Sequence, residues 1–138
     1  MNILLVESDD FIRSLFQVAL EGDGFHVVAV KDNQEGLAAS DAMPFDLVVA
    51  QFHAEGDAAG VTDLLAVLRA RAPRCKLLAV ISGFQIKSSE AKSMRRLLNP
   101  WRTVDLTWGG HVLLDACQDA AMEQQPHAFP IAANEQSL

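Results

Sequence analysis

The chain has 138 residues, of which 50% are apolar and 21% are charged. This is the length of one ordinary domain with enough apolar residues for a hydrophobic core. The apolar runs are short, each well below the roughly 18 residues that a membrane span requires. The first residues lack a secretory signal, and two cysteines, Cys75 and Cys117, are too few for a disulfide framework. We therefore expect one cytoplasmic domain without membrane association.

The net charge of −7 is unevenly distributed along the chain. Residues 1–68 hold 12 acidic and 2 basic residues, whereas residues 69–102 hold 1 acidic and 9 basic residues. The remaining residues are again acidic, with 5 acidic and no basic residues. An acidic chain is not expected to bind nucleic acid broadly, but the basic segment is a candidate surface for an anion or a protein partner.

Short apolar runs alternate with amphipathic stretches from the N-terminus to residue 81. The runs predict strands over 3–6, 25–30, 46–50 and 76–81. Apolar residues at helical spacing from Phe11 to Ala19 predict a first helix, and Asp32 followed by Glu35 marks the start of a second. A third helix is expected over 61–68. This order predicts an α/β fold with a doubly wound parallel sheet and crossover helices.

The pattern weakens after residue 82. A helix that starts at Ser88 or Ser89 meets Asn99-Pro100 almost at once, which leaves room for a fifth strand only around 97–98. We therefore expect the fourth helix and the fifth strand to be shortened or remodelled. A last helix is expected to start at Asp105. The domain then spans 1–122, and residues 123–138, which hold two prolines, form a C-terminal tail.

Ligands of a doubly wound sheet bind outside the carboxyl ends of its strands. The residues just after the predicted strands are therefore the main candidates for a functional site. The motifs at and near these positions are, in chain order, Ile3-Leu4-Leu5-Val6-Glu7-Ser8-Asp9-Asp10 with Arg13, Leu20-Glu21-Gly22, Phe45-Asp46-Leu47-Val48-Val49, Ser82-Gly83 and Asn99-Pro100-Trp101. In order and spacing, over residues 2–122, this series resembles the receiver domain of bacterial two-component response regulators. The resemblance implies a five-stranded, flavodoxin-like fold and a signalling role without enzymatic activity of its own.

The resemblance also implies a phosphorylation site. Receivers accept a phosphoryl group on an aspartate at the end of the third strand, with Mg²⁺ held by that aspartate and an acidic pair after the first strand. A Ser or Thr after the fourth strand and a Lys before a proline after the fifth strand contact the phosphoryl group.

This chain departs from that set. The nucleophile position falls on Gln51, whose amide cannot form an acyl phosphate, and the lysine position falls on Asn99. Glu7 matches the first acid and Ser8 the second, while Ser82 matches the switch hydroxyl.

Magnesium binding is expected to be weak, because only Glu7 matches a ligand position and Asp9 is displaced toward the helix start. For Asp9 and Asp10 the pattern favours helix capping and compensation of the helix dipole over metal binding. We therefore expect no required cofactor, and Glu7 with Asp9 as the only candidates for a weak Mg²⁺ site.

The sequence favours a degenerate receiver, or pseudo-receiver, that acts by phosphorylation-independent protein–protein interaction in a two-component or related pathway. Two alternatives remain open. One is an atypical phosphoacceptor, with Asp46 or Asp57 as the acceptor. The other is a sensor of a small anionic ligand such as a nucleotide, held by Arg95, Arg96 and Arg102.

The expected working surface spans residues 87–108. It contains basic and aromatic residues of the kinds that anchor interfaces, namely Lys87, Lys92, Arg95, Arg96 and Arg102 around Trp101 and Trp108. We expect a protein partner of a signalling pathway, or a homodimer, at this surface.

Overall fold

The structure, a computed structural model, describes residues 1–52, 57–82 and 88–124, and of residues 57–59, 88, 90 and 91 the backbone only. Its centre is a five-stranded parallel sheet in the order β2-β1-β3-β4-β5. The strands are β1 (Asn2–Val6), β2 (His26–Val30), β3 (Leu47–Gln51), β4 (Lys76–Ile81) and β5 (Arg102–Asp105). The predicted fold class is confirmed.

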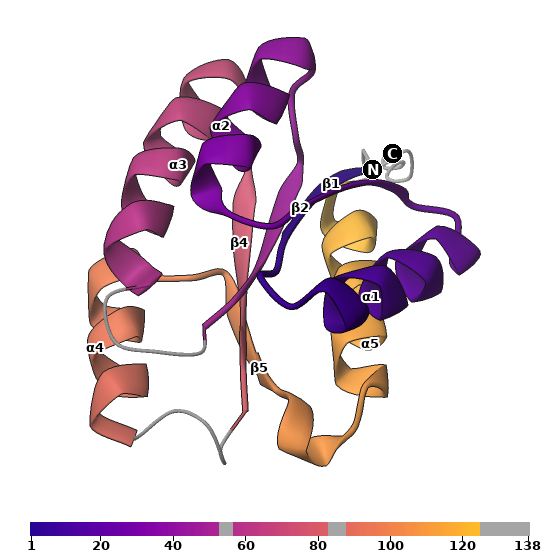
Figure 1. The fold of residues 1–138 in the computed structure, drawn as a ribbon, viewed down its shortest axis with the longest axis vertical. Helices are drawn as coiled ribbons and strands as arrows, with labels where there is room; N and C mark the ends of the chain where they lie inside the picture. Colours follow the sequence, from indigo (N-terminus) through magenta and orange to yellow (C-terminus); the bar gives the residue numbers. More distant parts are fainter. Residues whose placement is uncertain (53–56, 83–87, 125–138) are drawn as a thin grey trace, which may run out of the picture.

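The helices cover both faces of the sheet (Figure 1). They are α1 (Asp10–Gly22), α2 (Asn33–Ala42), α3 (Asp57–Arg71), α4 (Ser88–Leu98) and α5 (His111–Gln124), with a short 3-10 helix, η1 (Leu106–Trp108). One core cluster lies under α2, α3 and α4, and a second lies under α1 and α5. The three central strands are buried on both faces, which explains why the chain shows them as unbroken apolar runs.

Two aspartates start helices as the sequence predicts. The carboxylate of Asp9 accepts a hydrogen bond from the Ile12 N–H at 2.9 Å, and that of Asp32 accepts one from the Glu35 N–H at 2.9 Å. The side chain of Glu35 accepts in turn from the Lys31 N–H. These bonds satisfy backbone donors that the first turn of a helix leaves unpaired.

The last third of the chain differs from the sequence prediction. Leu97 and Leu98, where a fifth strand was expected, end α4, and β5 follows Pro100 instead. With four residues β5 is the shortest described strand, and its pattern is hard to detect because only Val104 in it is buried. The segment after Asp105 forms η1 before α5 begins, because Gly109 (φ +106°) interrupts the helix.

The first helix is less buried than its apolar spacing predicts. Phe16 and Leu20 belong to the core, whereas Phe11, Leu15 and Val18 are exposed. At the other end of the chain, α5 continues to Gln124, two residues past the expected domain boundary. The rest of the expected tail, residues 125–138, lies outside the described residues. Within the described ranges, none of the helices combines the length and the apolar character needed to cross a membrane.

Candidate functional site

The carboxyl ends of the strands meet at one edge of the sheet. Val6 pairs with Val30 on one side and with Ala50 on the other, Gln51 pairs with Val80, and Ile81 pairs with Asp105. This register brings together four of the predicted site positions, which are Glu7, Ser8, Gln51 and Ser82. The loops after β3 and β4 are described only in part, and Lys87 lies outside the described residues.

Glu7 is buried, and its Oε2 accepts a hydrogen bond from the Asp9 N–H at 2.7 Å. Its backbone carbonyl accepts from Arg13 Nη1 at 2.9 Å. Arg13 also pairs with Asp10, at 2.6 Å from Oδ1. The carboxylate of Glu7 therefore orders the turn into α1. Arg13 stabilises the same turn, although the sequence prediction assigned it no role.

Gln51 ends β3 and faces a small cavity of about 190 Å³. The cavity is lined by Val6, Ser8, Lys31, Asp32, Asn33, Ala50, Gln51 and Val61. Two buried oxygens, Oε1 of Gln51 and Oδ1 of Asn33, have no hydrogen-bond partner among the described residues. An amide therefore occupies the end of β3, and Lys31 and Asn33 are cavity residues that no motif in the sequence identified.

Asn99 is not at the site, which corrects the sequence prediction. The Trp101 N–H donates to the carbonyl of Leu77, near the start of β4, so residues 99–101 lie at the opposite, amino edge of the sheet. Asn99 has φ +45°, and its N–H donates to the Arg95 carbonyl at 2.9 Å. Asn99-Pro100 is thus the stop signal of α4, because asparagine tolerates the left-handed conformation at a helix end.

Asp105 takes the place that Asn99 was expected to fill. It is the last residue of β5 and pairs in register with Ile81, directly before Ser82. Its Oδ1 accepts a hydrogen bond from the Thr107 N–H at 2.9 Å. Where the resemblance implies a lysine, this chain therefore carries a carboxylate.

The residues at this edge do not fit the Mg²⁺ site of the resemblance. Gln51 and Ser8 are neutral, and the Asp9 carboxylate caps α1. Among the residues that the structure describes, no three His, Cys, Asp or Glu side chains come together as a metal site. A hard divalent cation prefers several converging charged oxygens, and the described part of this edge does not assemble them.

The basic and aromatic residues expected to form one surface are divided between the two faces of the sheet. Lys92, Arg95 and Arg96 are exposed on α4, which packs on the α2–α3 face. Trp101 packs into the cluster under α1 and α5 instead.

Arg102 belongs to the α5 side. It lies 4.4 Å from the ring of Trp101 and pairs with Asp119 of α5 at 2.6 Å. Trp108 is exposed in η1, beyond the other end of β5. The expected three-arginine anion site is therefore wrong, because Arg102 does not lie with Arg95 and Arg96.

A larger cavity of about 450 Å³ lies at the amino edge of the sheet, lined in part by Met1, Asp46 and Cys75. Asp46, one alternative phosphoacceptor, accepts a hydrogen bond from the Asn2 N–H at 2.7 Å there. It is thus remote from the strand ends where the phosphorylation site was expected. The side chain of Asp57, the other alternative, lies outside the described residues.

Solved structures resemble this chain closely in fold. The signal receiver domain of an HD domain-containing protein from Pseudomonas fluorescens Pf-5 has a TM-score of 0.71 and 21% identity, and the match covers 89% of this chain and 95% of that one. A CheY-like response regulator receiver domain protein from Methanospirillum hungatei JF-1 has a TM-score of 0.70 and 23% identity, with 89% and 94% covered. The response regulator TrrA from Thermotoga maritima, in complex with Mg²⁺-BeF, has a TM-score of 0.65 and 16% identity, with 86% and 97% covered.

No protein-family model matches the chain, and a search of curated proteins finds no match either. The strand order and the two helical layers define a doubly wound α/β domain. In particular, the fold is that of a response regulator receiver domain.

Proposed function

We propose that this chain is a pseudo-receiver, a signalling domain that acts through protein contacts and without aspartyl phosphorylation, in a two-component or related regulatory pathway. The receiver fold supports the signalling role. The chemistry of the strand ends supports independence from phosphorylation, because Gln51 ends β3 and Asp105 ends β5. An amide is not a nucleophile for phosphoryl transfer, and a carboxylate repels the charge of the transferring oxygens.

Incubation of the full chain with acetyl phosphate and Mg²⁺, followed by intact-mass spectrometry, tests this proposal. We expect no phosphoryl adduct, whereas a phosphorylatable receiver treated in parallel gains one. The variant Gln51→Asp should gain little, because β5 still ends in the carboxylate of Asp105 where the receivers that the chain resembles carry a lysine. The double variant Gln51→Asp/Asp105→Lys should gain more. An adduct on an aspartate of the parent chain would overturn the proposal in favour of the atypical phosphoacceptor.

We further propose that the chain has no enzymatic activity.

We also propose that the partner surface of the chain includes the basic α4 face, defined by Lys92, Arg95, Arg96 and Leu97. All four side chains are exposed, with the three cations together on the helix and Leu97 to one side of them. Interfaces often combine apolar and charged contacts in this way. Both thiols of the chain, Cys75 and Cys117, are unpaired, which supports the reducing cytoplasm as its place of action.

A further inference from the structure

The apolar residues of α1 form a stripe that the fold leaves uncovered. Phe11, Leu15 and Val18 are 75%, 54% and 69% exposed, and they account for three of the large exposed apolar side chains in the described chain. Their spacing of four and then three residues places them in one row on the helix. These three residues are called the α1 stripe below. Such a row is the shape that packs against another helix.

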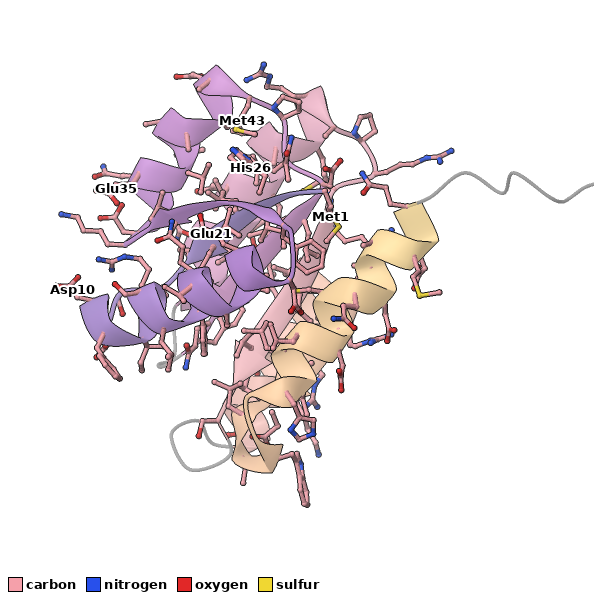
Figure 2. All side chains as sticks on the ribbon, turned by 90° about the vertical axis from the view of Figure 1, so that its right-hand side faces the viewer. Met1, Asp10, Glu21, His26, Glu35 and Met43 are labelled. Carbon is pink, nitrogen blue, oxygen red and sulfur yellow. The ribbon has the colours of Figure 1, made fainter. Side chains whose placement is uncertain are left out.

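The flank of the α1 stripe is acidic. Asp10 and Glu21 lie near the two ends of α1 (Figure 2), about 16 Å apart at the helical rise. The Asp10 side chain is 90% exposed although it also pairs with Arg13. Between Asp9 and Asp23 the chain has four acidic residues and one basic residue.

The basic α4 face has the opposite character. Its three cations lie together on one side of Leu97, which is 59% exposed, and the helix as a whole has three basic residues and one acidic residue. The two surfaces belong to opposite faces of the sheet, since α1 packs on the same core cluster as α5 while α4 packs on the other. One copy therefore cannot bring its own two surfaces together.

We propose that the α1 stripe of one copy binds the basic α4 face of a second copy. Pairing of two α1 helices, whether parallel or antiparallel, would bring acidic ends against acidic ends, and pairing of two α4 helices would oppose cations. The α1–α4 contact places an apolar row against Leu97 and brings acids to bases. Because the two surfaces differ, the contact is heterologous and repeats head to tail, giving a ring or an open chain of copies.

This inference rests on the proposed function, since it names the partner of the basic α4 face as a second copy of the chain. Sedimentation velocity of the full chain over a wide range of concentrations tests it. The weight-average mass should rise with concentration beyond a dimer, and salt should weaken the association because charges contribute to it. A chain that stays monomeric at all concentrations would overturn the inference.

Charge exchange gives the sharper test. The variant Arg95→Glu/Arg96→Glu should associate at least about tenfold more weakly than the parent. A second variant, Ser14→Lys/Glu21→Lys, should lose association to a similar extent, and it leaves the Asp10–Arg13 pair intact. Mixed together, the two variants should associate again, because each contact then joins opposite charges. If the equimolar mixture remains as monomeric as its components, the inference is wrong.

Two controls separate this contact from general effects of charge and stability. Arg71→Glu/Arg74→Glu makes the same change of net charge at exposed positions in and just after α3, and it should associate like the parent. Leu15→Ser should abolish association, whereas Met122→Ser, at a 70% exposed position of α5, should not. Equal effects in each pair would overturn the inference.

The phosphorylation assay decides the proposed function separately. A parent chain that accepts no phosphoryl group and remains monomeric would overturn the self-association alone.

Discussion

Gly60 of α3 lies against the side chain of Asn33, the first residue of α2 and a wall of the cavity beside Gln51. A Cβ added at Gly60 would overlap the side-chain nitrogen of Asn33 and lie 3.4 Å from its Cγ. In Gly60→Ala the asparagine amide must therefore leave its place or α3 must move away. By contrast, a Cβ added at Gly22, which ends α1, meets nothing within 4 Å.

Two effects of opposite sign determine the stability of Gly60→Ala. Alanine in a helix interior gains about 1 kcal/mol over glycine, whereas forcing the Asn33 side chain out of its place costs about 1–3 kcal/mol, as overpacking does. We expect a net loss of about 1 kcal/mol in the free energy of unfolding. In an Asn33→Ala background the obstacle is gone, so the same substitution should stabilise the chain by up to about 1 kcal/mol.

Urea unfolding of the four chains in this double-mutant cycle, followed by circular dichroism, measures the coupling between the two positions. We expect a coupling of about 2 kcal/mol, the difference between the two backgrounds. Gly22→Ala serves as the control and should be neutral or stabilising in both backgrounds. If Gly60→Ala stabilises the parent and the Asn33→Ala chain equally, the packing argument fails.

Four further measurements test the site and the core. Asp9→Ala should lower the free energy of unfolding by about 1 kcal/mol through loss of the helix cap, and Asp9→Asn should retain most of it. In calorimetric titration, micromolar Mg²⁺ should not saturate the chain. Saturation that is lost in Glu7→Gln would show that the carboxyl ends of the strands assemble a metal site. Burial raises the pKa of the Cys75 thiol to about 11 and that of the Cys117 thiol to about 12, so both should resist a thiol reagent at pH 8 until the chain is unfolded. Because the folded chain keeps these protons longer than the unfolded chain, stability should fall as the pH rises from about 9 toward these values; unchanged stability over that range would contradict this reasoning.

The sequence alone determined the elements that depend on local signals. The three central strands are apolar runs because the sheet buries them on both faces, and the aspartate caps of α1 and α2 act within one helical turn. The residue at the end of β3 was also predictable, because that end follows directly from the apolar run and Gln51 is the residue there. Such features need no partner from a distant part of the chain.

The tertiary structure alone determined the end of β5. A strand of four residues with Val104 as its one buried side chain has no periodicity to detect, and its position follows from pairing with β4. The sequence prediction therefore took Asn99, which ends α4, for the residue at the end of the fifth strand. The residue at that end is Asp105.

Packing between distant elements also determined which apolar and basic residues face solvent. The helical spacing of Phe11 and Leu15 is the same as that of a buried face, and only the position of α1 on the sheet leaves them uncovered. Arg102 was grouped with the arginines of α4 by its position in the chain, yet its partner, Asp119, comes from α5. Spacing along the chain reports which residues share a face of a helix, whereas the contacts of that face depend on how the helices and the sheet pack together.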